Sequence, residues 1–151
     1  MRKTGEKETG KDPVLTIAGR QRAGDLMRKL KHKHIRRIYV TQYLRTQMTA
    51  DSMRIQLGID TVHYVADTTG EDLVKKIFQH GDTRNSILVI GHTNTLPQII
   101  RKLGVMNFPK GNLPDEEFDN LFLVRSKMHT VKLSKYKYGG ASGASAEMKP
   151  L

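Results

Sequence analysis

The sequence contains no cysteine among its 151 residues. The chain therefore forms no disulfide, offers no thiolate nucleophile and cannot build a cysteine-based zinc site. This absence does not identify a compartment, because many exported proteins also lack cysteine. The spacing of histidines and carboxylates does not resemble a closed metal site either, so we expect neither a bound metal nor a cofactor.

Long apolar segments are also absent. No apolar run approaches the roughly 20 residues that a membrane span needs, and residues 1–11 are basic without the apolar stretch of a secretory signal. As written, the sequence predicts a cytoplasmic chain with no membrane partner. An export signal is expected only if the native chain is longer, so the sequence leaves the compartment open.

Positive charge exceeds negative charge. Lysine and arginine number 26 against 15 acidic residues, which gives a net charge of +11. Such an excess favours anionic partners, either phosphorylated small molecules, nucleic acid or acidic membrane surfaces. A basic cluster that supports nucleic acid comprises Lys29, Lys31, Lys33, Arg36 and Arg37. Only Tyr39 and Tyr43 lie near it to stack on bases, and such clusters are usually solvated, so nucleic acid is the least favoured partner.

Length and composition predict one domain. With 37% hydrophobic residues, we expect a single core within residues 13–138. Residues 1–12 are polar, include Gly5 and Gly10, and are predicted to form a flexible arm. The small, polar residues 139–151 are predicted to form a disordered tail.

Hydrophobic spacing predicts alternating helices and strands. Helices are expected at about residues 17–31, 44–57, 73–78 and 97–103. Strands are expected at residues 35–40, 62–66 and 86–90, with two late strands at 121–124 and 130–136 that form a hairpin-like pair. The run 86–90 is apolar, as in a strand buried on both faces. This alternation indicates an α/β fold with a parallel, layered sheet. Core candidates on the first two helices are Ala23, Leu26, Met27, Leu30, Met48, Met53 and Leu57.

A histidine stands at the end of one expected strand. Residues 87–97 place His92 between an apolar strand and a helix whose first turn holds Pro97. Ligands of parallel α/β sheets collect at this edge, and free amide groups at a helix start favour an anion such as phosphate. A lone histidine is nevertheless more often structural.

An arginine occupies the corresponding place after another strand. Residues 38–50 form a strand, a turn and a helix with Arg45 in its first turn. The planar guanidinium can hold two phosphate oxygens at once. Such an arginine alone is usually a solvated helix residue, but two strand ends with complementary chemistry favour a shared pocket.

Three ordered motifs resemble one known family. The stretch 12–23 resembles a leucine-threonine-x-x-glycine motif, Arg45–Ala50 resembles R-T-x-x-T-A, and Gly91–Asn94 matches G-H-[ST]-N. Together they resemble the histidine phosphatase (phosphoglycerate mutase-like) superfamily over residues 6–138, and residues 117–122 are similar to small bacterial members. The resemblance implies a three-layer α/β/α sandwich with a mostly parallel sheet.

The resemblance also implies a function. Complete relatives hydrolyse phosphate monoesters through a phosphohistidine intermediate, so the expected ligand is a phosphorylated small molecule or phosphohistidine. Carried onto this chain, Arg45 and Thr93 would bind the phosphoryl group, and His92 would bind it and stabilise its charge during transfer. Asp67, with Glu71 behind it, is the candidate proton donor, although a loop carboxylate or helix cap is the commoner role. Mutase activity is less expected, because the chain is compact.

The sequence departs from the family at the nucleophile. Relatives read arginine-histidine-alanine-glutamate-lysine where this chain has residues 3–7, so Lys3 stands at the arginine's place and Thr4 at the histidine's. No general base lies adjacent to Thr4. The first central strand also looks missing or truncated, and we expect the complete chain to carry it upstream of Glu6.

Impaired hydrolysis is therefore expected, and the alternative is a phosphate-binding pseudoenzyme or regulatory module. The remaining histidines are expected to be structural or solvated: His32, His34, His63, His80 and His129. The oligomeric state is not predicted.

Overall fold

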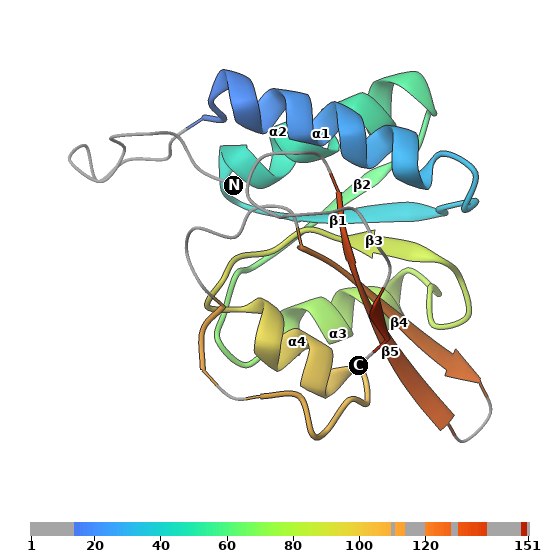
Figure 1. Ribbon diagram of the computed structural model, residues 1–151. Coiled ribbons are helices and arrows are strands. Elements are labelled where there is room, and N and C mark those ends of the chain that lie inside the picture. The colour runs from blue at the N-terminus through green and yellow to red at the C-terminus, as the bar shows by residue number, and fades with distance from the viewer. Residues whose placement is uncertain (1–13, 110, 114–119, 128–129, 139–148, 151) are drawn as a thin grey trace.

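The computed structural model describes residues 14–109, 111–113, 120–127, 130–138 and 149–150 (Figure 1). Its helices are α1 (Ile17–Leu30), α2 (Leu44–Gln56), α3 (Glu71–Gln79) and α4 (Leu96–Lys102). Its strands are β1 (Arg37–Thr41), β2 (Thr61–Tyr64), β3 (Ile87–Val89), β4 (Asn120–Lys127), β5 (Thr130–Lys137) and β6 (Lys149–Pro150). Strands and helices alternate as the hydrophobic spacing predicts.

A parallel sheet with the order β2-β1-β3 forms the middle layer. The helices α1 and α2 cover one face, and α3 and α4 cover the other (Figure 1). Side chains alternate along the central strand β1, so that Ile38 and Val40 join one core while Tyr39 joins the other. The structure confirms the predicted three-layer α/β/α arrangement, which is consistent with a phosphoglycerate mutase-like fold.

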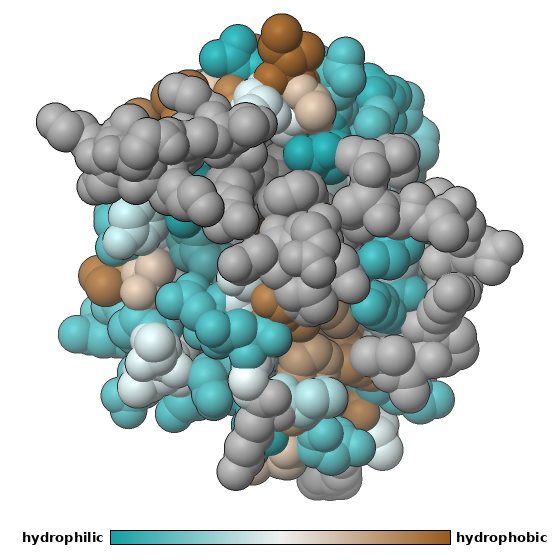
Figure 2. Space-filling view, turned by 60° about the vertical axis from the view of Figure 1, so that its left-hand side comes forward, coloured by the Kyte–Doolittle hydropathy of each residue, from teal (hydrophilic) through white to brown (hydrophobic). Residues whose placement is uncertain are grey.

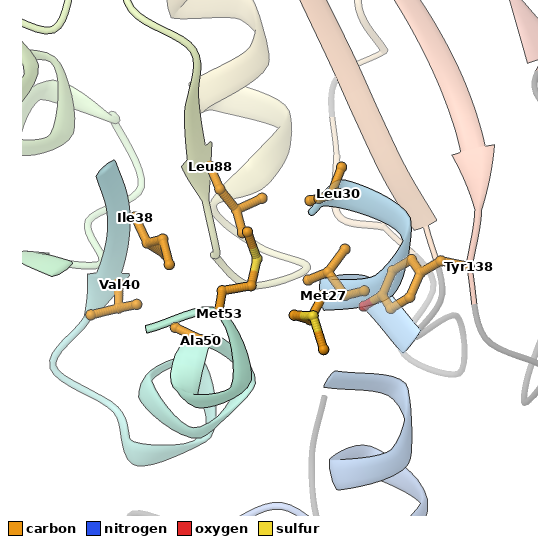
Figure 3. Packing of buried hydrophobic residues seen from close by; sticks show 9 residues of the cluster. Met27, Leu30, Ile38, Val40, Ala50, Met53, Leu88 and Tyr138 are labelled. Carbon is orange, nitrogen blue, oxygen red and sulfur yellow. The ribbon is translucent and has the colours of Figure 1, made fainter. Parts of the chain in front are cut away.

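The first core lies between the sheet and the helices α1 and α2 (Figure 3). It contains Leu26, Met27, Leu30, Ile38, Val40, Ala50, Met53, Leu88 and Tyr138. Helix α1 begins where Thr16 accepts a hydrogen bond from the backbone N–H of Gly19 at 3.0 Å, as an N-cap does. Most predicted core positions are buried, but Leu57 is 37% exposed because α2 ends before it.

The second core lies between the sheet and the helices α3 and α4. It contains Tyr39, Tyr64, Leu73, Ile77 and Ile99. Helical spacing also placed Phe78 among the apolar positions, yet Phe78 is 68% exposed. Leu73 and Ile77 are four residues apart and share the inward face of α3, so the following residue points away from the sheet.

The late strands form a separate antiparallel sheet with the order β4-β5-β6. Leu121 and Tyr138 pack on the first core, and the rings of Phe108 and Phe122 meet edge to face at 5.6 Å. The hairpin is confirmed and is longer than predicted. Lys149 and Pro150, which belong to the tail expected at residues 139–151, pair with its open edge as β6. The expected arm, residues 1–12, and the rest of that tail lie outside the described residues.

Strand β3 is less buried than its apolar sequence predicts. Leu88 is buried, but Ile87 and Val89 are only half-buried. Within the described residues, β3 pairs with β1 alone and therefore lies at an edge of the parallel sheet. This edge position explains why the expectation of burial on both faces is wrong.

A buried charge network anchors the start of β1. The carboxylate of Asp82 accepts hydrogen bonds of 2.6 Å from Arg37 Nε and from the Tyr39 hydroxyl, and one of 2.8 Å from Asn85. Burial alone would raise the pKa of Asp82, but these hydrogen bonds lower the pKa below the ordinary 3.8. Arg37 therefore serves the fold as an ion-pair partner, and it is not a free member of the basic cluster.

Asp82→Asn is expected to lower the free energy of unfolding by about 3 kcal/mol at neutral pH, because a half-buried guanidinium loses its counter-charge. A carboxylate with a lowered folded pKa stabilises the protein above its unfolded pKa, and this contribution disappears as the pH falls through the folded value. Urea titrations from pH 7 to pH 2 should thus show a shallower decline for the variant below pH 3.8. As a control, Asp51→Asn removes an exposed pair with Arg54 and should cost under about 1 kcal/mol. Equal losses in the two variants would contradict the buried network.

Gly104 lies just after the end of α4 and packs closely against Val131 in strand β5 of the hairpin. Its φ is +117°, and a Cβ there would lie 2.9 Å from a methyl carbon of Val131. Gly104→Ala should destabilise the protein by about 2 kcal/mol or more through backbone strain and steric overlap. Gly58→Ala is the control, because Gly58 also has a positive φ of +65° but nothing within 4 Å. Urea denaturation should show the larger loss for Gly104→Ala, and the reverse order would contradict the packing.

Candidate functional site

The carboxyl ends of the three parallel strands meet at one edge of the sheet. The backbone N–H of Ala66, after β2, donates to the Gln42 side chain, after β1, at 3.1 Å. The hydroxyl of Tyr64 donates to the carbonyl of Ile90, after β3, at 2.9 Å. These bonds hold the three loops together, so the strand-end residues form one continuous surface.

Arg45 and His92 meet at this edge. The guanidinium Nη2 of Arg45 lies 3.3 Å from Nδ1 of His92, although the residues are 47 positions apart. Both side chains are half-buried. The structure thus brings together the two side chains that the sequence placed at neighbouring strand ends.

Tyr43 lies beside both side chains and was not among the predicted site residues. Its ring meets the His92 ring edge to face at 5.2 Å, and the Arg45 guanidinium lies 5.2 Å from its centroid. These contacts add a cation–π attraction and restrict the orientation of the imidazole. The sequence signal that could have identified Tyr43 is its place between the strand end and Arg45.

The turn that positions Arg45 is fixed by Thr46. Its hydroxyl donates to the carbonyl of Tyr43 at 2.9 Å and accepts from the backbone N–H of Thr41 at 3.0 Å. The side chain of Gln47 donates to the Thr41 carbonyl at 3.1 Å, and Thr49 donates to the Arg45 carbonyl at 2.7 Å. The polar residues around Arg45 therefore fix the backbone of the turn between β1 and α2.

The loop that carries His92 is a compact turn closed by Thr95. The hydroxyl of Thr95 accepts from the His92 backbone N–H at 3.1 Å, and the carbonyl of His92 accepts from the N–H groups of Thr95 and Leu96 at 3.0 and 2.9 Å. These two amides are therefore engaged within the turn and are not free to bind an anion. Thr93, the third predicted phosphate-binding residue, is half-buried and its carbonyl accepts from Leu113 at 2.9 Å.

Gly91 is required by close packing at the same turn. A Cβ at this position would lie 3.0 Å from Leu96 and 3.1 Å from the Tyr64 hydroxyl. A side chain here would push apart the groups that connect β2 to the loop. Close packing therefore explains why a residue without a side chain precedes His92.

Asp67 lies at the end of β2 but is committed to the start of α3. Its Oδ1 accepts from the N–H groups of Thr69 and Gly70 and from the Thr69 hydroxyl, at 2.9, 2.6 and 2.8 Å. Burial opposes ionisation, but these hydrogen bonds outweigh it and lower the pKa of Asp67. Glu71 is exposed in the first turn of α3. This geometry is that of a loop carboxylate that closes the turn before α3, whose N-cap residue is Gly70.

Other polar features lie away from this edge. A cavity of about 550 Å³ is found at the opposite end of β1 and β2, lined by Arg37, Arg54, Gly58, Ile59, Asp60, Thr61, Val62 and His80. Among the described residues, no three metal-ligating side chains gather, and no helix has the length and apolar character of a membrane span. His32, His34 and His63 are exposed, and His129 lies outside the described part of the chain.

One comparison with known proteins gave a match, which covers the first part of the chain. The model of the histidine phosphatase superfamily (branch 1) matches residues 2–67, a range that includes Arg45 and the motif around Thr16. No curated protein matched the chain. No solved structure matched it either. The family match over residues 2–67 and the phosphoglycerate mutase-like arrangement of the layers support the assignment of the chain to the histidine phosphatase superfamily.

Proposed function

We propose that the edge formed by Arg45 and His92 binds the phosphoryl group of a phosphate monoester, either a phosphorylated small molecule or phosphohistidine. The observation that carries this proposal is the approach of the guanidinium to the imidazole at 3.3 Å. A guanidinium stays charged at any working pH and can hold two phosphate oxygens at once.

The surroundings of Arg45 support the same role. The side chains that contact Arg45 are the imidazole of His92 and the ring of Tyr43, and neither is a carboxylate. In the part of the chain that the structure describes, no carboxylate forms an ion pair with Arg45, whereas Arg37 is paired with Asp82. Arg45 therefore keeps its positive charge for an incoming anion. We further propose that the Thr93 hydroxyl donates to a phosphate oxygen beside His92.

We propose that this chain binds the phosphoryl group with little or no turnover. Hydrolysis in the superfamily requires a nucleophilic histidine, and Thr4 stands at that place in the sequence. A threonine hydroxyl needs an adjacent base to attack phosphorus, and a phosphothreonine ester would hydrolyse slowly. The chain would then act as a phosphate-binding pseudoenzyme or regulatory module.

Asp67 is not included in this proposal as a proton donor. A general acid must carry its proton at the working pH, which requires a raised pKa. The pKa of Asp67 is lowered, and its carboxylate holds the turn before α3. We infer that Asp67 is a structural residue at the rim of the site.

A nucleic-acid partner gains no support from the described residues. Arg37 of the basic cluster is paired with Asp82, and Lys29 lies over the ring of Tyr136 at 5.2 Å. Hydrophilic residues cover much of the coloured surface in Figure 2. A hydrophilic surface of this kind is expected of a solvated face in a chain with a net charge of +11.

The phosphate site is tested by calorimetric titration with inorganic phosphate and by hydrolysis of p-nitrophenyl phosphate. Arg45→Ala should weaken phosphate binding by roughly 10- to 100-fold, because charge-assisted hydrogen bonds are lost, and His92→Ala should also weaken it. Arg54→Ala is the matched control, since it removes an exposed arginine from the same helix and should leave binding unchanged.

Two outcomes would overturn parts of this proposal. Wild-type protein that binds no phosphate, or that loses no affinity in Arg45→Ala, refutes the site. Hydrolysis that disappears in both Arg45→Ala and His92→Ala refutes the proposal of little or no turnover, because contaminating phosphatase would remain active in those samples.

The role of Asp67 is tested by its own substitution. Asp67→Ala should lower the free energy of unfolding by about 1 kcal/mol through the loss of the hydrogen bonds that close the turn before α3, and phosphate affinity should not change. Asp67→Asn keeps an acceptor oxygen and should cost less. A variant of wild-type stability with reduced phosphate affinity or hydrolysis would instead assign Asp67 to the chemistry.

A further inference from the structure

Two buried hydroxyl groups connect β1 and α2 to His92. The Oγ1 atoms of Thr41 and Thr46 lie 2.9 Å apart, and Thr41 Oγ1 lies 3.0 Å from Nε2 of His92. Both threonines are buried. Sequence reasoning missed Thr41, because a threonine at a strand end is common and nothing local reveals its histidine partner 51 positions away.

The direction of these hydrogen bonds follows from the number of protons. Thr46 has one hydroxyl proton and donates it to the carbonyl of Tyr43 at 2.9 Å. The contact between the two hydroxyls must then use the proton of Thr41. Thr41 has no second proton, so toward His92 it can only accept, and Nε2 of His92 must carry a hydrogen.

Arg45 leads to the same result from the other side of the ring. A guanidinium has donors only, so Nδ1 of His92, 3.3 Å from Nη2, must be the unprotonated acceptor. The opposite direction, in which Thr46 donates to Thr41 and Thr41 donates to Nε2, would require Nδ1–H. That arrangement sets two donors against each other at Arg45. Only the Nε2–H tautomer satisfies both contacts.

We propose that Thr41, held by Thr46, is a positioning residue that fixes the Nε2–H tautomer of His92 and presents Nδ1 beside Arg45 as an acceptor. The tautomer stands on the geometry alone, and its consequence for ligands rests on the proposed phosphate site. A guanidinium next to an acceptor nitrogen suits a phosphate group that retains one proton. Its P–OH donates to Nδ1 while its other oxygens accept from Arg45.

The proposal distinguishes phosphate from sulfate. Both anions are tetrahedral, but at neutral pH sulfate carries no proton to donate to Nδ1. We expect the wild-type chain to bind phosphate at least about tenfold more tightly than sulfate, because one hydrogen bond is lost and two acceptors face each other. In Thr41→Val, which replaces the hydroxyl with a methyl group, this preference should fall.

The test uses the full chain labelled with ¹⁵N and long-range ¹H–¹⁵N NMR of the imidazole, with His92→Gln to assign the signal. We expect the Nε2–H tautomer in the wild type without ligand, a mixture in Thr41→Val, and a return to the wild-type pattern in Thr41→Ser. The backbone amide spectrum of each variant establishes that it is folded. Calorimetric titrations with phosphate and sulfate follow on the same samples.

An Nδ1–H tautomer in the wild type would overturn the proposal without any variant. A folded Thr41→Val protein with the wild-type tautomer would also overturn it. A wild-type chain that shows Nε2–H but binds neither anion supports the positioning by Thr41 and refutes the phosphate site, so the two ideas fail separately.

Discussion

The parallel pairing of β1 with β3 is the constraint on which the site depends. In this register, Tyr39 lies opposite Val89, so the turns after both strands emerge at the same edge of the sheet. Arg45 follows one strand and His92 follows the other. A shift of one residue would turn every side chain of β1 to the opposite face, and both cores prevent such a shift because Ile38 and Tyr39 are fully buried on opposite sides.

The two ends of strand β1 make different kinds of contact. At its start, Asp82 neutralises Arg37 and accepts from Tyr39 in a buried network. At its end, the Thr41 hydroxyl contacts Nε2 of His92, and Arg45 forms no ion pair with a carboxylate among the described residues. A charge paired inside the protein gives a fixed structure, whereas an arginine without a carboxylate partner keeps its field for a ligand.

Much of the fold was predictable because it depends on local spacing. Leu26, Met27 and Leu30 gave the inward face of α1 directly, and the alternation of strands and helices gave the layers. The separate antiparallel sheet and the partial burial of Val89 were not predictable, since an edge is defined by neighbours distant in the chain. Thr41 and the engaged amides of Thr95 and Leu96 were missed for the same reason, because residue spacing does not reveal the hydrogen-bond partner of each group.

The contrast between two arginines explains why Arg45, and not the more basic stretch near Arg37, is the place to look for an anion. Arg37 contributes to the net charge of +11, yet its field is cancelled at 2.6 Å by Asp82. Arg45 contacts an imidazole nitrogen and an aromatic ring, which orient the guanidinium without neutralising it. We therefore expect anion binding to follow the uncompensated charge at the edge of the sheet rather than the density of basic residues along the sequence.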